Sequence, residues 1–278
     1  MQVPDLSIRQ RNRQFIEQNE DCRKAISEMR KVEAFLDDFG TLSSGRDFVL
    51  YGKHAFSLQV VSAACELTVG SIISCYEAGC MADANSLLRK YRDDLFFYLY
   101  VMICDSEKQP DGKSSAVIRM EENIEKWIND GLSDLPIGAV LQSIGRSPRV
   151  KEAVQKYHLQ TYFDGLGTRL NNYVHSNGVS FYNKCVYAYR GTGLQQQMQD
   201  LLKDLRFITI TFLFLLALCS PLSISSSDYV DRLDCNMTPP EGSEYWVAPF
   251  IAEFIKNNIE LIDESCLNYL KENTLMEI

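Results

Sequence analysis

Apolar side chains recur every seven residues along the first part of the chain. Within residues 5–38 this row comprises Ile8, Phe15, Cys22, Met29 and Leu36, and a second row comprises Ala25, Val32 and Phe39. Such spacing places both rows on one side of an α-helix. Pro4-Asp5 is typical of a helix start, and Gly40 with Ser43-Ser44-Gly45 is typical of a helix end. The pattern predicts one long amphipathic helix, which packs either on its own chain or against a helical partner.

The next two segments are strongly apolar and have helical spacing. Residues 47–76 and 81–105 are separated by Gly79, a residue typical of helix ends. They predict two buried antiparallel helices. Gln109-Pro110-Asp111-Gly112 predicts a turn, and residues 114–130 predict a shorter amphipathic helix that Gly131 stops.

Further helices are predicted in the second half of the chain. Ser147-Pro148 is typical of an N-cap with a first-turn proline and begins a helix to about Gln160. Residues 161–176 predict the next helix, with Asn177-Gly178 at its end. Gly165 and Gly167 weaken its first turns, so a start at Thr168 is the alternative. Residues 194–220 and 247–270 predict the last two helices.

The most apolar run is Phe207–Leu222, which contains no charged side chain. Its 16 residues are fewer than the about 20 that a membrane-spanning helix needs, and it includes Pro221. The run therefore predicts a buried central helix and not a membrane span. Since no segment shows clean strand alternation between turn signals, the predicted fold is all-α.

Composition indicates a globular intracellular protein. Hydrophobic residues make up 46% of the chain, and its nine cysteines form no Cys-x-x-Cys pair. The polar N-terminus lacks the apolar core of a signal peptide, so we expect reduced cysteines and a cytoplasmic location. The three histidines, His54, His158 and His175, lack the spacing of metal ligands. We therefore expect neither a metal nor another cofactor.

The net charge of −9 is concentrated near the C-terminus. Residues 226–278 contain eleven acidic and three basic side chains, which leaves the rest of the chain near −1. Upstream of residue 169, a basic cluster contains Arg146, Arg149, Lys151 and Lys156 with one acidic residue, Glu152. This cluster predicts either a small RNA-facing surface or an ordinary solvated helix face.

Arg169 and His175 are the candidates for chemistry. On a helix, His175 lies on the same side as Asn171 and Asn172, whose amides can orient its imidazole. Arg169 supplies a permanent cation that can reach a phosphate between the two positions. His175 supplies a group that titrates near neutral pH. The set contains no nucleophile, and RNA brings its own in the 2′-hydroxyl.

Arg169, five intervening residues and His175, within Leu-Asn-Asn-Tyr-Val-His-Ser-Asn-Gly near a predicted helix end, resemble the arginine-x4-6-histidine signature of HEPN-domain proteins. Leu170 stands where that family usually has a polar residue. The resemblance implies a HEPN-like bundle of about eight helices. The resemblance covers about residues 47–220. For the whole chain we expect three parts: an N-terminal amphipathic helix (1–45), the HEPN-like bundle (46–225) and an acidic C-terminal helical region (226–278), the first and last of which lie outside the resemblance.

The same resemblance implies a metal-independent endoribonuclease, typical of bacterial toxins and antiviral effectors, whose active site is composed from two chains of a homodimer. His175 would act as acid or base, Arg169 would bind the phosphate, and Asn171 and Asn172 would assist. The alternative function is a non-catalytic helical module that binds RNA or recruits a protein through its first helix.

Arg89 is a further candidate for substrate binding. The Leu-Leu-Arg run that ends at Arg89 resembles a second-helix pattern of some HEPN-like families, which would direct it toward the motif helix. The alternative is a set of local pairs along one helix, Arg89 with Asp93 and Lys90 with Asp94, which need no tertiary contact. Arg92 is not expected to contribute to activity. No glycine-rich phosphate loop or Gly-x-Ser-x-Gly motif is present.

Overall fold

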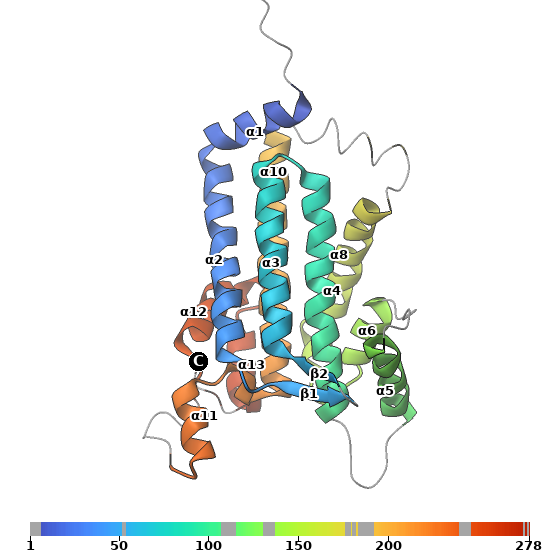
Figure 1. The fold of residues 1–278 in the computed structure, drawn as a ribbon, viewed down its shortest axis with the longest axis vertical. Helices are drawn as coiled ribbons and strands as arrows, with labels where there is room; N and C mark the ends of the chain where they lie inside the picture. The colour runs from blue at the N-terminus through green and yellow to red at the C-terminus, as the bar shows by residue number, and fades with distance from the viewer. Residues whose placement is uncertain are drawn as a thin grey trace, which may run out of the picture.

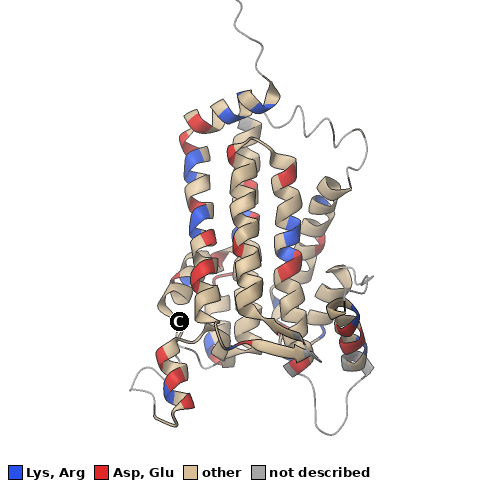
Figure 2. Ribbon diagram, viewed as in Figure 1, with Lys and Arg blue, Asp and Glu red and all other residues tan. Residues whose placement is uncertain are grey.

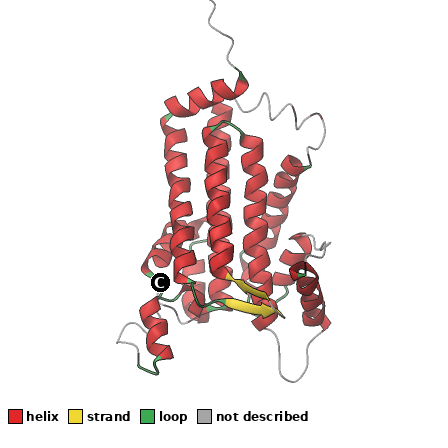
Figure 3. Ribbon diagram, in the orientation of Figure 1, coloured by secondary structure: helices red, strands yellow, loops and turns green. Residues whose placement is uncertain are grey.

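The computed structural model describes residues 7–51, 54–106, 115–129, 137–175, 179, 182, 192–238, 246–274, 276 and 278. Of this described part, 81% is helical and 4% is strand, so the prediction of a mostly helical chain is confirmed (Figure 3). The described part contains twelve α-helices in place of the about eight predicted, because the first and last predicted helices are each divided in two and the helices Ile137–Ile144 and Ser227–Asp234 were not predicted.

Five long helices form the body of the molecule: α2 (Glu20–Leu42), α3 (Leu58–Glu77), α4 (Met81–Ser106), α8 (Leu159–Val174) and α10 (Thr192–Cys219). Figure 1 shows α2, α3 and α4 side by side, with α8 beside α4 and α10 behind α3. Gly79 ends α3 in the left-handed conformation (φ 72°), as its sequence position predicts, and α4 then runs back along α3.

The predicted single N-terminal helix is wrong in one respect, because it is broken at Asn19. α1 (Ile8–Gln18) ends there and α2 begins, with the backbone of Asn19 extended and its side chain accepting a hydrogen bond from the backbone N–H of Cys22 (3.0 Å). Cys22, Met29 and Leu36 are buried in the core of the chain. The part of the apolar stripe on α2 is thus covered by the chain itself, whereas Ile8 and Phe15 on α1 are partly exposed.

The prediction that the whole of residues 47–76 is helical is also wrong. Its first part forms an antiparallel hairpin of β1 (Phe48–Tyr51) and β2 (His54–Ser57), with Val49 opposite Phe56. Val49 is buried, and Phe56 contacts the rings of Phe97, Tyr98 and Trp127. Strands this short give too few alternating positions to be distinguished from a helical run. Ser57 then caps α3.

The middle of the chain contains α5 (Ser115–Ile128), α6 (Ile137–Ile144) and α7 (Lys151–Lys156) before α8. The predicted helix from Ser147 to Gln160 is wrong at both ends. α7 begins at Lys151 with Val150 as its N-cap residue, so Ser147-Pro148 does not start it, and His158 adopts a left-handed conformation (φ 52°) that separates α7 from α8. α8 begins at Leu159, before both predicted starts, and includes Gly165 and Gly167. The predicted turn at 109–112 and the stops at Gly131 and 177–178 lie outside the described residues.

The predicted helix 247–270 is wrong as a single element. It is divided into α12 (Pro249–Asn258), the short 3-10 helix η3 (Ile259–Leu261) and α13 (Cys266–Thr274). The carboxylate of Asp263 accepts from the backbone N–H of Ser265 (2.8 Å), a local bond that competes with helix continuation. After α10 the chain forms the 3-10 helix η2 (Pro221–Ile224) and α11 (Ser227–Asp234).

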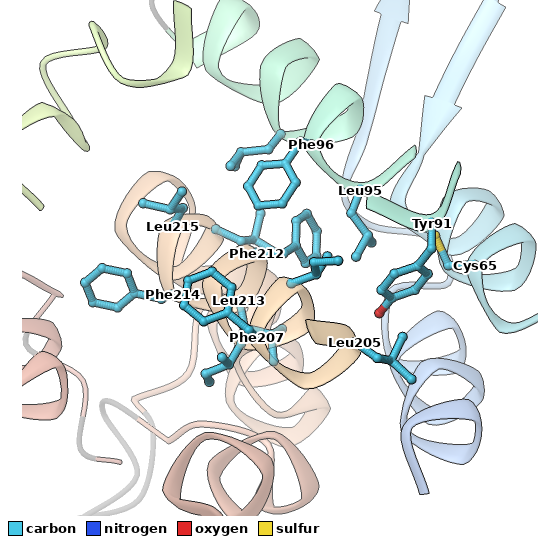
Figure 4. Packing of buried hydrophobic residues seen from close by; sticks show 14 of the residues in the cluster. Cys65, Tyr91, Leu95, Phe96, Leu205, Phe207, Phe212, Leu213, Phe214 and Leu215 are labelled. Carbon is cyan, nitrogen blue, oxygen red and sulfur yellow. The ribbon is translucent and has the colours of Figure 1, made fainter. Parts of the chain in front are cut away.

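The core surrounds α10, and the predicted burial of its apolar run is confirmed. Phe207, Leu213 and Leu215 are buried, and Figure 4 shows side chains of α10 packed toward Tyr91, Leu95 and Phe96 of α4. Leu222 lies beyond the end of α10 and is exposed. One cluster of buried residues draws on all three segments predicted as separate parts, for example through Met29, Leu99 and Ile255.

One helix of the described part, α3, is long and apolar enough to cross a membrane by length and composition alone. Core helices of soluble proteins have the same composition, and α3 packs between α2 and α4.

Candidate functional site

α8 carries the predicted catalytic residues and is fixed to the bundle by one apolar face. The buried residues of that face are Leu159, Phe163, Leu166 and Leu170. Their spacing of three and four positions leaves the rest of the helix toward its edges and solvent. Leu170, which stands where the HEPN signature usually has a polar residue, therefore packs into the hydrophobic core.

Arg169 is bound to the neighbouring helix. Its Nη2 pairs with the carboxylate of Asp204 on α10, and the Tyr162 hydroxyl donates to the other carboxylate oxygen (3.1 Å). The side chain of Asp204 is 7% exposed and that of Arg169 is 40% exposed. One end of the guanidinium is thus fixed against a buried acid, while part of the side chain reaches solvent.

For Asp204 and Arg169, burial and the charge of the partner shift the pKa in opposite directions. Burial raises the pKa of Asp204, and the Arg169 guanidinium limits that rise. Burial alone would lower the pKa of Arg169, but the Asp204 carboxylate outweighs it and the pKa is raised. Burial, with the nearby carboxylate, raises the pKa of Tyr162 well above its ordinary value. The charges of Arg169 and Asp204 therefore offset each other, and Tyr162 remains a hydrogen-bond donor.

His175 lies at the C-terminal end of α8 and is exposed. It is the C-cap residue, and its backbone N–H donates to the backbone carbonyl of Asn171 (3.0 Å). The predicted helical segment 169–175 is therefore confirmed as far as Val174. An exposed imidazole at a helix end is open to a ligand from solvent.

The two asparagines of the predicted site have different surroundings. The side-chain oxygen of Asn171 is buried and accepts no hydrogen bond within the described residues, whereas Asn172 is exposed. The imidazole of His175 therefore does not donate to that oxygen in this structure. Of the two, Asn172 lies where a ligand near His175 can reach it.

The basic cluster lies at the other end of α8. Arg146, Arg149 and Lys151 precede the helix, and α8 contains 16 residues, which corresponds to a length of about 24 Å. Nη1 of Arg149 donates to the backbone carbonyl of Cys219 at the C-terminal end of α10 (3.0 Å), which is a helix-capping contact. The structure therefore does not bring this cluster together with His175.

Arg89 makes the local contact that was the alternative prediction. Its Nε lies 3.6 Å from the carboxylate of Asp93, and Lys90 pairs with Asp94. Both pairs lie along α4, where basic and acidic positions follow one another in Figure 2. Arg89 is thus paired without help from α8.

The sequence did not predict the environment of Arg92. This side chain is fully buried, and its Nε and Nη2 donate to Oδ1 of Asp93 at 2.8 and 2.7 Å. Its Nη1 has no partner within the described residues and lies 3.3 Å from where a Cβ on Gly167 of α8 would be. Contact between a buried arginine and a glycine on another helix leaves no pattern in the sequence. The one local sign is Gly167 itself, because glycine is unfavourable inside a helix.

The described residues contain no group of three or more His, Cys, Asp or Glu side chains that could hold a metal ion. No protein-family model, curated protein or solved structure matches this chain.

Proposed function

We propose that the protein is a HEPN-like, metal-independent endoribonuclease that acts as a cytoplasmic homodimer, in a toxin or antiviral role. The observation that supports it best is the arrangement on α8, where the exposed residue His175 caps the same helix that carries the partly exposed side chain of Arg169. The mostly helical fold and the sequence resemblance of this helix agree with the proposal.

In the proposed reaction the 2′-hydroxyl oxygen attacks the adjacent phosphorus, and the bond from phosphorus to the 5′-oxygen breaks. His175 takes the proton of the 2′-hydroxyl, and a second acid returns a proton to the leaving 5′-oxygen. The products are a 2′,3′-cyclic phosphate and a 5′-hydroxyl. A homodimer would supply the second acid as His175 of the other copy.

Asp204 and Tyr162 have a positioning role in this proposal. They fix one end of the Arg169 guanidinium, so that its remaining N–H donors keep one orientation toward a phosphate. The cost is that Asp204 offsets the charge of Arg169. Phosphate binding would therefore depend more on directed hydrogen bonds than on net positive charge.

The second candidate function is a non-catalytic helical interaction module. The observation in its favour is the same ion pair, because Arg169 already has a carboxylate partner and joins α8 to α10 without any ligand. The distance of Arg146, Arg149 and Lys151 from His175 also favours it.

RNA cleavage by the full chain in the presence of EDTA tests the proposal. Single-stranded RNA should yield 2′,3′-cyclic phosphate ends, and DNA of the same sequence should be resistant because it lacks the 2′-hydroxyl. His175→Ala should lower the rate by at least about a hundredfold, the scale of a lost general acid or base, at a stability cost of about 1 kcal/mol or less. Arg169→Ala should also lower the rate.

His158→Asn is the matched control, because His158 is also exposed, lies at the opposite end of α8, and has a left-handed backbone that asparagine accepts. Its rate should equal that of the unaltered chain. A folded His175→Ala protein with full activity would contradict the catalytic assignment. If the unaltered chain cleaves no RNA and His175→Ala unfolds it, the interaction module becomes the better description.

A further inference from the structure

A hollowed surface in the C-terminal region lies apart from α8. Two adjoining hollows, of about 530 and 500 Å³, have Trp246 and Pro249 in common. The first hollow is lined by Ser226, Asp228, Tyr229, Asp231, Arg232, Trp246 and Pro249. It lies between the start of α12 and one side of α11.

The backbone holds Trp246 beside α11. The carbonyl of Trp246 accepts from the N–H of Ser226 (3.1 Å), and Val247 pairs with Ser225 in an antiparallel bridge. Arg46 donates through Nη2 to the Ser227 hydroxyl (3.0 Å), which fixes the first turn of α11 to the bundle. Trp246 is nevertheless 47% exposed, and it lines the hollow.

The chemistry of the first hollow favours a cation. Among the described lining residues, the aromatic side chains of Trp246 and Tyr229 lie with the carboxylates of Asp228 and Asp231 and with one guanidinium, that of Arg232. A lysine or arginine head group gains from the face of an indole and from carboxylate acceptors together.

α11 itself is an amphipathic helix whose apolar side is only partly covered, at Tyr229 and Val230. None of its eight residues is buried, although Tyr229, Val230 and Leu233 follow one another on one side. Leu233 is 43% exposed and Met237, just beyond the helix, is 55% exposed. Figure 1 shows α11 extending beyond the end of the bundle, and Figure 2 shows acidic positions along it. Exposed apolar side chains in such a row are typical of a protein-binding surface.

We propose that this surface, formed by α11 and the Trp246 hollow, binds a basic amphipathic segment of a partner protein. A lysine or arginine of the segment enters the hollow between Trp246, Asp228 and Asp231. Its apolar side chains cover Leu233 and Met237.

The negative charge of this surface favours a basic protein segment over RNA or a second copy of the chain. Residues 226–278 contain eleven acidic and three basic side chains, and α11 alone contains Asp228, Asp231 and Asp234 against Arg232. RNA would be repelled by such a surface, because nucleic-acid binding depends on neutralising phosphates with basic groups. A second copy of the chain would bring like charges together. A basic protein segment complements both the charge and the apolar row.

Calorimetric titration of the full chain with a synthetic amphipathic lysine–leucine peptide tests the proposal. Trp246→Ala should weaken binding by at least about tenfold, as expected for a central aromatic anchor. Asp228→Asn with Asp231→Asn should weaken binding to a similar extent and reduce its dependence on salt. Because these side chains are on the surface, all three substitutions should leave the fold intact by circular dichroism.

The matched control is Glu122→Gln with Glu125→Gln on α5, which removes the same charge from a different hollow. Its affinity should equal that of the unaltered chain. The proposal is overturned if Trp246→Ala binds the peptide normally or if a glutamate–leucine peptide binds equally well. Saturable binding of poly(U) RNA or of phosphatidylserine vesicles that Trp246→Ala abolishes would also overturn it. Self-association of the chain that Trp246→Ala abolishes would overturn the proposal as well.

Discussion

The guanidinium of Arg169 on α8 pairs with the carboxylate of Asp204 on α10, 35 positions later in the chain. Tyr162, two turns before Arg169, donates to the same carboxylate. The arginine of the HEPN-like motif therefore belongs to a three-residue group that joins two helices of the bundle. This group can position Arg169 for a phosphate or can be purely structural, and the two roles differ in what substitutions do.

Asp204→Ala should lower the free energy of unfolding by about 2 kcal/mol. The substitution leaves the partly buried Arg169 guanidinium without its partner and removes the acceptor of the Tyr162 hydroxyl. This loss of unfolding free energy is smaller than expected for a fully buried ion pair, because 40% of the Arg169 side chain is exposed. Chemical denaturation followed by circular dichroism measures it.

Asp200→Ala is the control for that substitution. Asp200 lies one turn before Asp204 on α10, and its carboxylate accepts only an exposed bond from Gln196 among the described contacts. Its loss should cost about 0.5 kcal/mol or less. Equal effects of the two substitutions would show that the pair with Arg169 contributes little to stability.

Arg92→Ala should be among the most destabilising single changes on α4, with a loss of about 3 kcal/mol or more. It removes a fully buried side chain and leaves the carboxylate of Asp93 without its two closest donors. Arg89→Ala, which removes the longer 3.6 Å pair with the same carboxylate, should cost about 1 kcal/mol or less. Thermal unfolding of the two variants gives the comparison, and a larger loss for Arg89→Ala would contradict it.

Leu215→Arg should prevent folding, whereas Leu222→Arg should be tolerated. Leu215 lies in the core on α10, where an arginine would be buried without a carboxylate, while Leu222 is 51% exposed. Both residues belong to the same apolar run of the sequence, so the pair separates burial from composition. Soluble yield and circular dichroism are the measurements. A folded Leu215→Arg protein would be evidence against α10 as the central core helix.

Asp47→Asn should stabilise the protein more at neutral pH than in mild acid. Burial raises the pKa of Asp47 above its ordinary value of 3.8, although the Ser223 hydroxyl donates to it and Arg46 lies near. A raised folded pKa means that the unfolded chain releases its proton first, so stability is lost as pH rises from about 3.8 through the folded pKa. Asparagine has no such loss and accepts the positive φ of this position.

Denaturation of both proteins across this pH range tests the sign. The difference in unfolding free energy, variant minus unaltered chain, should grow as pH rises. A difference that shrinks toward neutral pH would show that the ionised carboxylate of Asp47 is favoured by the fold.

Features that depend on near neighbours in the chain could be predicted from the amino-acid sequence. The apolar run 207–222 predicted the buried central helix α10, and Gly79 predicted the end of α3 before α4. The pairs of Arg89 with Asp93 and Lys90 with Asp94 could also be predicted, because residues four apart are neighbours on the surface of a helix. The breaks at Asn19 and His158 were missed, since capping and a left-handed residue interrupt a pattern that otherwise continues.

The environment of the candidate site depends on how the helices pack and could not be predicted from the sequence. Helix packing brought Asp204 to Arg169, placed Arg92 against Gly167, and put the whole length of α8 between Arg149 and His175. The physical reason is that helical periodicity fixes which side of a helix is apolar but not which helix lies beside it. Contacts between residues far apart in sequence depend on how five long helices turn and stack in one core, and no local spacing records that arrangement.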